Sequence, residues 1–308
     1  MKQAVLKHIK NTWMLMRFIA VASSSVTTIV SAMLPLFLYG HISNEKLLII
    51  FLLLLFGGVF IHGVLTHILN DHTDHLSGTD QNSPAILSGG SRVIQDGIIS
   101  AENLWRLGKL LIAAISIGIV FLSVFGFYKV ALLLAIGLWS AWSYSLPPLQ
   151  LSYKPFVGEW LSMFPAVFAL GIGGPWIALG TIPEWALQNA AINAFFCNAW
   201  VMVHHIPDRD ADRAASPKKF TSVVWAADRF GLSFAKFPAL LYFGMMACCV
   251  LWLGTDRFWA AIGLITISII AIGMLFKMKV DDHEQVSNYE KLLLLMAMVT
   301  GIGLGIFI

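Results

Sequence analysis

Acidic side chains are concentrated in two short segments of this chain. Of its eleven aspartates, eight lie either between residues 70 and 104 or between residues 207 and 234. They are Asp71, Asp74, Asp80 and Asp96 in the first segment, and Asp208, Asp210, Asp212 and Asp228 in the second. Aspartates that only solvate a surface would be scattered more evenly, so both segments are candidate sites for chemistry.

The spacing inside each segment places oxygen ligands on one face of a helix. Asn70 and Asp74 are four residues apart, with Asp71 beside them, and Asp208 and Asp212 repeat the interval. Residues at this interval are neighbours on a helix. Close like charges repel, so a shared divalent cation would explain the pattern. Mg²⁺ favours one or two carboxylates together with substrate phosphate oxygens. The alternative is that the acids only solvate two loops.

The rest of the chain is strongly apolar. Its 308 residues are 58% hydrophobic and 12% charged, with a net charge of +3 and a mean hydropathy of +0.77, whereas soluble domains carry roughly 25% charged residues. So little charge cannot cover the surface of such a chain in water, and the composition predicts a polytopic membrane protein. It excludes an ordinary soluble enzyme, a disordered chain, a nucleic-acid-binding module and a disulfide scaffold.

Nine segments are apolar over a length that can span a bilayer as a helix, which takes about 20 residues. They are residues 12–38, 46–69, 105–126, 128–146, 159–180, 186–206, 235–254, 258–276 and 289–308. We therefore expect an all-α bundle of nine transmembrane helices, with residues 1–308 forming one domain. The acidic segments follow the second and the sixth span, which indicates a pseudo-repeat of roughly 12–146 and 159–276 with a ninth helix added.

Lysine and arginine are distributed unequally between the two sides of these spans. Seventeen of the twenty belong to the N-terminus and to the helix ends and loops on its side, and only Lys46, Lys129 and Arg257 to the other. Basic residues accumulate on the cytoplasmic side of membrane proteins. We therefore expect a protein of the cell's inner (plasma) membrane, with a cytoplasmic N-terminus and with both long loops, 70–104 and 207–234, in the cytoplasm.

Four blocks of sequence carry a family resemblance. They are residues 70–80 (NDHTDHLSGTD), 88–100 (SGGSRVIQDGIIS), 144–154 (YSLPPLQLSYK) with Gly158 and Glu159, and 205–215 (HIPDRDADRAA). Two aspartate motifs on cytoplasmic loops of a nine-helix protein resemble the UbiA superfamily of intramembrane prenyltransferases. The four blocks together are similar to the branch that prenylates 1,4-dihydroxy-2-naphthoate in menaquinone synthesis.

The resemblance implies helices around a central, lipid-accessible cavity that is capped by the cytoplasmic loops. It also implies that the two motifs hold Mg²⁺ on the diphosphate of an isoprenyl donor, through Asn70, Asp71, Asp74, Asp208 and Asp212. The isoprenyl group would pass to a hydrophobic aromatic acceptor, a dihydroxynaphthoate or another phenolic ring. Some members of the superfamily are terpene cyclases, so ionisation and cyclisation of the donor without an acceptor is the alternative.

Basic residues near the motifs are candidates for binding the diphosphate, because cations stabilise the charge that develops on this leaving group. They are Arg92, Lys154, Arg209, Arg213, Lys218 and Lys219. Arg92 is favoured by its Gly-rich segment. The two adjacent lysines lie in a stretch, 216–220, that departs from the Gly-Lys-Arg-Thr usual in the family. The alternative for all six is a role in topology or in contact with anionic lipid headgroups.

Other polar residues of the apolar segments have two interpretations each. Tyr144 ends the fourth span, where its ring would face an allylic cation or would anchor the helix at the membrane interface. His204 and His205 would position an acceptor hydroxyl or would only pack. A transition-metal site among the four histidines from 62 to 75 is disfavoured by the neighbouring carboxylates and Asn70. An ion-coupled transporter is disfavoured because such ion sites lie near the bilayer midplane.

Overall fold

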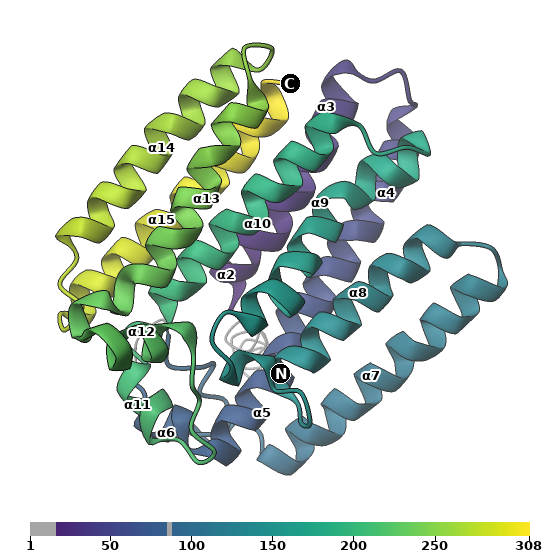
Figure 1. The fold of residues 1–308 in the computed structure, drawn as a ribbon. Coiled ribbons are helices and arrows are strands. Elements are labelled where there is room, and N and C mark those ends of the chain that lie inside the picture. Colours follow the sequence, from purple (N-terminus) through teal and green to yellow (C-terminus); the bar gives the residue numbers. More distant parts are fainter. Residues whose placement is uncertain (1–16, 85–87) are drawn as a thin grey trace, which may run out of the picture.

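The structure, a computed structural model, describes residues 17–84 and 88–308 and has no β-strand among them. Long helices lie side by side across the molecule (Figure 1). In chain order the long segments are α2 (Phe18–Val21), η1 (Ala22–Val26) and α3 (Thr27–Tyr39); α4 (Asn44–Gly58), η2 (Val59–Thr66) and α5 (His67–Ser77); α7 (Ala101–Val124); α8 (Tyr128–Ser145); η4 (Glu159–Met163) and α9 (Phe164–Leu179); α10 (Glu184–His204); η5 (Leu232–Lys236) and α13 (Phe237–Leu253); α14 (Phe258–Lys277); and α15 (His283–Ile306). The all-α prediction is confirmed for the described residues.

Each long segment lies where an apolar span was predicted, although residues 12–16 of the first span fall outside the described residues. Seven helices in the described part are long and apolar enough to cross a membrane. The other two long helices are α8 and α10. The mean hydropathy of α10 is lowered by amides that are buried inside the bundle, such as Asn189, which donates hydrogen bonds to the carbonyls of Ser31 and Leu304. The count of nine membrane crossings therefore stays a prediction.

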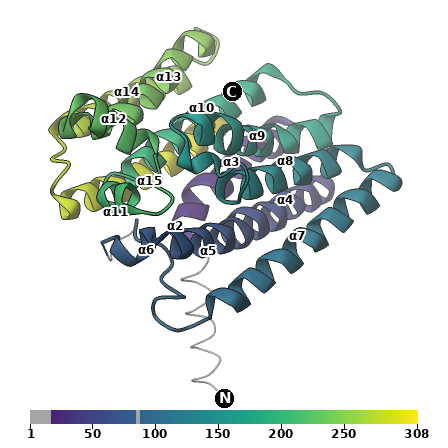
Figure 2. The same cartoon turned by 60° about the horizontal axis from the view of Figure 1, so that its bottom comes forward.

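Burial differs between the middle and the edge of the bundle. The central helix α10 is mostly buried and packs against α9, α13 and α15. Figure 2 shows α7 at the edge, where it packs mainly against α8 and α5 and exposes Leu110, Ile117 and Val124. A face of large apolar side chains is unfavourable in water and favourable in lipid. The protein is accordingly an integral membrane protein.

The two acidic segments lie at one end of the bundle, in different local structures. The helix that includes α5 continues two turns past residue 69, the end predicted for this span, and Gly78 follows it at a φ of 84°. By contrast, α10 ends at His204, and the second acidic segment forms the short helix α11 (Arg209–Ala214). The short helices α6 (Thr79–Asn82) and α12 (Ser222–Phe230) lie at the same end (Figure 1). The α11 segment packs on α6, so the two acidic segments form one cap over this end.

Candidate active site

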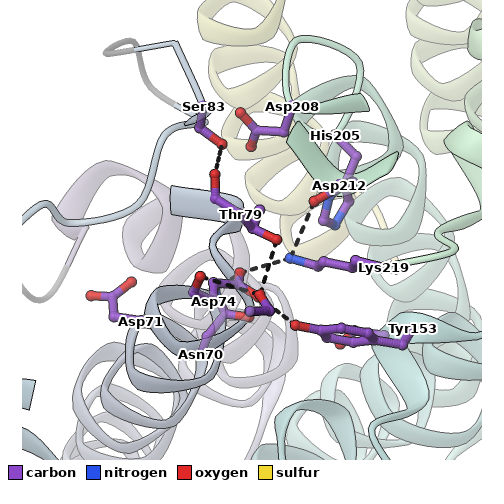
Figure 3. Close-up of polar contacts among 12 residues, drawn as sticks. Asn70, Asp71, Asp74, Thr79, Ser83, Tyr153, His205, Asp208, Asp212 and Lys219 are labelled. Carbon is purple, nitrogen blue, oxygen red and sulfur yellow. Dashed lines mark hydrogen bonds and ion pairs between the residues drawn. The ribbon is translucent and has the colours of Figure 1, made fainter. Parts of the chain in front are cut away.

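A buried lysine joins the two acidic motifs. Lys219 follows α11, and its Nζ lies 2.7 Å from Oδ2 of Asp74 on α5 and 3.7 Å from Oδ1 of Asp212 on α11. Figure 3 shows the ammonium between the two carboxylates. The backbone N–H of Ser216 also donates to the carbonyl of Ser77, over 2.9 Å. Two segments more than 130 residues apart in the sequence thus meet in a single site.

The carboxylates of the first motif, Asp71 and Asp74, are buried on α5. Asp74 accepts hydrogen bonds from Asn70 over 3.0 Å and from the hydroxyl of Tyr153 over 3.2 Å, in addition to its bond with the lysine. Asp71 accepts a hydrogen bond from the hydroxyl of Ser91 and lies 3.3 Å from a guanidinium nitrogen of Arg17. Asp74 is therefore fixed by partners from three parts of the chain, and Asp71 by partners from two.

The second motif carries carboxylates with fewer partners. From the described residues, Asp208 accepts one hydrogen bond, donated by the hydroxyl of Ser88 over 3.0 Å. Asp212 is fully buried, yet neither of its oxygens has a hydrogen-bond partner among the described residues. The basic side chains beside it are Lys219 and His205, and Nδ1 of the histidine lies 3.7 Å from Oδ2. A buried carboxylate without hydrogen bonds is unfavourable unless another cation or a ligand completes it.

The acids outnumber the cations that contact them. Five aspartates are buried in this region: Asp71, Asp74, Asp80, Asp208 and Asp212. Within 4 Å, the described residues supply only Arg17, Lys219 and His205 as basic partners for these five. Because the acids repel one another, an added cation would stabilise the cluster.

The pKa values reflect the same imbalance. Burial, with repulsion from Asp74 and Asp71, raises the pKa of Asp80 to about 7. Burial and the charge of Asp212 likewise raise the pKa of Asp208. Burial alone would lower the pKa of Lys219, but Asp74 and Asp212 together hold it well above its usual value. The lysine is therefore charged, whereas the raised pKa values of Asp80 and Asp208 favour their protonated, neutral forms.

A large cavity opens beside the acid cluster, with a volume of about 1040 Å³. Its polar lining comes from the two motifs and their neighbours: Asn70, Asp74, Asp80, Arg92, Asp208 and Lys219. Most of its remaining wall is apolar and comes from α4, α7, α8 and α9: Leu53, Phe56, Leu122, Leu134, Val167 and Leu170. The cavity thus suits a ligand with an anionic head and a long apolar tail.

Three of the basic residues expected at the diphosphate point elsewhere. Arg209 is buried, but its guanidinium donates to the carbonyl of Val280, over 2.8 Å, and to Asp281. Arg213 and Lys218 both pair with Asp228 on the exposed side of the cap. The partners of all three lie in the neighbouring connections and helices, and none of the three lines the cavity.

The remaining expected residues divide between the cavity and the surface. Lys154 is exposed and does not line the cavity. Arg92 does line it, with a φ of 59° and its Nε 3.8 Å from Asp96. Tyr144 also lines it, with its hydroxyl 3.4 Å from Nε2 of His205. The structure therefore brings Arg92 and Tyr144, but not Lys154, to the motifs.

Sequence reasoning missed three residues that the structure places at the site. Asp80 lines the cavity, and its Oδ2 has no hydrogen-bond partner among the described residues. The sequence could have indicated Asp80, because it is a further acid in the first motif, six residues after Asp74. Tyr153 and Arg17 contact Asp74 and Asp71 from distant parts of the chain. Tyr153 lies within the block 144–154 that carries the family resemblance, but nothing in that block singles it out, and no local pattern marks Arg17.

Comparisons with known proteins agree with this geometry. A family model described as the UbiA prenyltransferase family matches residues 24–299, which include both acidic motifs. The chain belongs to the UbiA prenyltransferase family. Its fold is similar to a structure described as a UbiA homolog from Archaeoglobus fulgidus bound to GPP and Mg²⁺, with a TM-score of 0.67, 13% sequence identity, and coverage of 96% of this chain and 99% of that one. No match was found among curated proteins.

Proposed function

We propose that this UbiA family member is a magnesium-dependent prenyltransferase, which moves an isoprenyl group within the membrane from a prenyl diphosphate to a hydrophobic aromatic acceptor. One observation carries the proposal. Asp212 has two buried oxygens that accept no hydrogen bond from any described residue, in an acid cluster at the polar end of an apolar cavity. Such a cluster needs cations and a polar ligand, and the cavity beside it accommodates a long apolar chain.

The donor set of the cluster fits magnesium. Its candidate ligands are the oxygens of Asn70, Asp71, Asp74, Asp208 and Asp212, and hard cations of this size prefer oxygen. No three Asp, Glu, His or Cys side chains of the described residues are arranged to hold a metal ion. A metal here would therefore take further ligands from the phosphates of the substrate, as Mg²⁺ commonly does. When bound, magnesium neutralises the negative charge that develops on the departing diphosphate.

The basic groups at the cavity act on the same leaving group. Lys219 and Arg92 line the polar end, and both supply N–H donors to phosphate oxygens. Arg17, which also lines the cavity, orients Asp71 through their 3.3 Å contact. This set replaces the three basic residues Arg209, Arg213 and Lys218, whose partners lie outside the cavity.

The apolar wall protects the reactive donor carbon. Side chains such as Leu54 and Leu134 exclude water, so that the allylic cation formed when the C–O bond breaks is captured by the acceptor and not hydrolysed. Tyr144, where the polar and apolar linings meet, offers its ring to that cation. The aromatic carbon of the acceptor forms the new C–C bond. It then loses a proton, or carbon dioxide if it carried a carboxylate, and the ring becomes aromatic again.

The topology completes the proposal. We place the acid cluster and the N-terminus on the cytoplasmic side of the inner membrane, with α8 and α10 as two further crossings beyond the seven. In this arrangement the chain is one domain, and both motifs follow equivalent helices of a pseudo-repeat. The branch that prenylates dihydroxynaphthoate remains our preferred assignment, on the sequence blocks that resemble it.

Product analysis tests the function. The purified protein in detergent is incubated with Mg²⁺ and prenyl diphosphates of several lengths, with and without 1,4-dihydroxy-2-naphthoate, and the organic products are identified by mass spectrometry. We expect a prenylated aromatic product. A cyclised hydrocarbon or alcohol formed without acceptor would instead establish the terpene cyclase alternative, and the absence of diphosphate release under every condition would refute both.

A further inference from the structure

One wall of the cavity carries polar groups that belong to neither acidic motif. Trp200 and His204 lie one turn apart on α10, and Glu290 lies on the facing helix α15. All three line the cavity. Nδ1 of His204 is 2.6 Å from Oε1 of Glu290, so the imidazole holds one carboxylate oxygen and fixes the orientation of the other.

One atom of this wall is buried without a partner, and a second has only a weak one. Oε2 of Glu290 has no hydrogen bond to any described residue, and the indole N–H of Trp200 has only the Cys197 thiol, a weak acceptor, beside it. Glu290 is fully buried and Trp200 is 5% exposed. A carboxylate oxygen without a partner and a donor with only a weak one are both costly inside a membrane bundle, and both residues line a cavity large enough for a ligand. The pair therefore indicates a binding partner that supplies both a donor and an acceptor.

A hydroxyl group is the simplest partner with both properties. Its O–H can donate to the free oxygen of Glu290, and its own oxygen can accept from the indole N–H of Trp200. The surrounding wall suits an aromatic ring, because Met163 and Cys197 also line the cavity and belong to the apolar cluster around Trp200. The Trp200 and His204 rings are also arranged edge to face, with centroids 5.9 Å apart.

We propose that Trp200 and Glu290 form the acceptor subsite and bind a hydroxyl group of an aromatic acceptor, with His204 as a positioning residue for the carboxylate. This inference rests on the proposed prenyl transfer and names the recognised group of its second substrate. The subsite lies on α10 and α15, whereas the apolar wall that suits the donor chain comes from α4, α7, α8 and α9. Donor and acceptor thus bind to different walls of one cavity.

The test measures donor and acceptor kinetics separately. The probe acceptor is 1,4-dihydroxynaphthalene, used with Mg²⁺ and a prenyl diphosphate that the wild-type chain accepts. Trp200→Phe removes the indole N–H and leaves a smaller aromatic ring, and Glu290→Gln replaces the carboxyl group by an amide. Glu284→Gln is the matched control, because Glu284 is exposed on the same helix. We expect the acceptor KM to rise about tenfold or more in both test variants, the scale of one lost hydrogen bond to a charged or buried group.

The donor KM distinguishes recognition of the acceptor from a general structural defect. We expect it to stay within about twofold of wild type in all three variants, since none of them touches the donor wall. An unchanged acceptor KM in Trp200→Phe would overturn the subsite even if Glu290→Gln failed to fold. Failure of the wild-type chain to transfer a prenyl group to any acceptor would overturn the proposed function itself, a result distinct from an intact activity that is insensitive to these substitutions.

Discussion

Two adjacent lysines provide a sharp test of how the cap is built. Lys219 and its partner Asp74 each have side chains that are 4% exposed, with 2.7 Å between the charged atoms. Lys218 is 43% exposed and pairs at 2.9 Å with the partly exposed Asp228. Both pairs have good geometry, so burial alone separates them. We predict that Lys219→Met is severely destabilising and inactivating, whereas Lys218→Met is nearly silent.

The magnitude follows from the difference in burial. Removing one partner of a buried ion pair costs about 3–5 kcal/mol, because the other charge is left uncompensated. An exposed pair is worth only about 0–1 kcal/mol. For a chain of this size, we expect the apparent Tm without metal to fall by roughly 5–15 °C in Lys219→Met. In Lys218→Met it should fall by no more than about 3 °C.

The assay combines unfolding with activity. Thermal unfolding of the detergent-solubilised variants is followed in EDTA and again with Mg²⁺. Added Mg²⁺ should stabilise Lys219→Met more than wild type, because a cation can then occupy the position between Asp74 and Asp212. Diphosphate release should fall about 100-fold or more in Lys219→Met, as when a donor to a developing anion is lost. Equal effects of the two substitutions on unfolding and on release would refute this reasoning.

Three further predictions address other parts of the molecule. Burial raises the folded-state pKa of Asp80 to about 7, so the folded protein loses stability as the pH rises through that value. Asp80→Asn should therefore stabilise the metal-free protein more at pH 8 than at pH 5. An equal gain in Tm at both pH values would contradict this. Gly118 lines the apolar wall, and no atom lies within 4 Å of a Cβ placed there. Gly118→Phe should therefore lower kcat/KM about tenfold for the longest donors and leave kcat/KM for short donors unchanged. An equal loss for all donors would argue against a donor chain at this wall. At the far end of the bundle, the guanidinium of Arg257 donates to Gln188, Asn189 and the carbonyls of Leu304 and Phe307. Arg257→Met should therefore lower the free energy of unfolding by about 3 kcal/mol without changing the donor KM. An unchanged Tm would show that this buried cluster is not stabilising.

The sequence was sufficient to locate the helices and the first motif. Lipid requires long apolar segments with internally satisfied backbones, so hydropathy marks the helices directly. The interval from Asn70 to Asp74 likewise predicted neighbours on one face, and the amide of Asn70 does donate to Asp74 over 3.0 Å. These features depend on periodicity along a single segment.

Features that depend on tertiary contacts could not be obtained in the same way. Lys218 and Lys219 lie in an irregular segment after α11. The backbone N–H of Lys219 donates a hydrogen bond to the carbonyl of Asp212, which helps to direct Lys219 inward. No spacing rule distinguishes the two. Arg17 reaches Asp71 across 54 residues, and the positive-inside pattern alone accounted for its charge. Arg209 looked equally suited to the site, but its guanidinium donates to the carbonyl of Val280 and the carboxylate of Asp281, in the connection before α15.

The most direct test of the central claim is diphosphate release by Asp212→Asn, compared with its neighbour Asp210→Asn. Both substitutions lie on α11, but Asp212 is fully buried beside the cavity lysine, whereas Asp210 is exposed and pairs with Arg213. Release from a prenyl diphosphate should require Mg²⁺ and stop in EDTA, should fall about 100-fold or more in Asp212→Asn, and should be nearly unchanged in Asp210→Asn. Full magnesium-dependent release by Asp212→Asn would contradict the account.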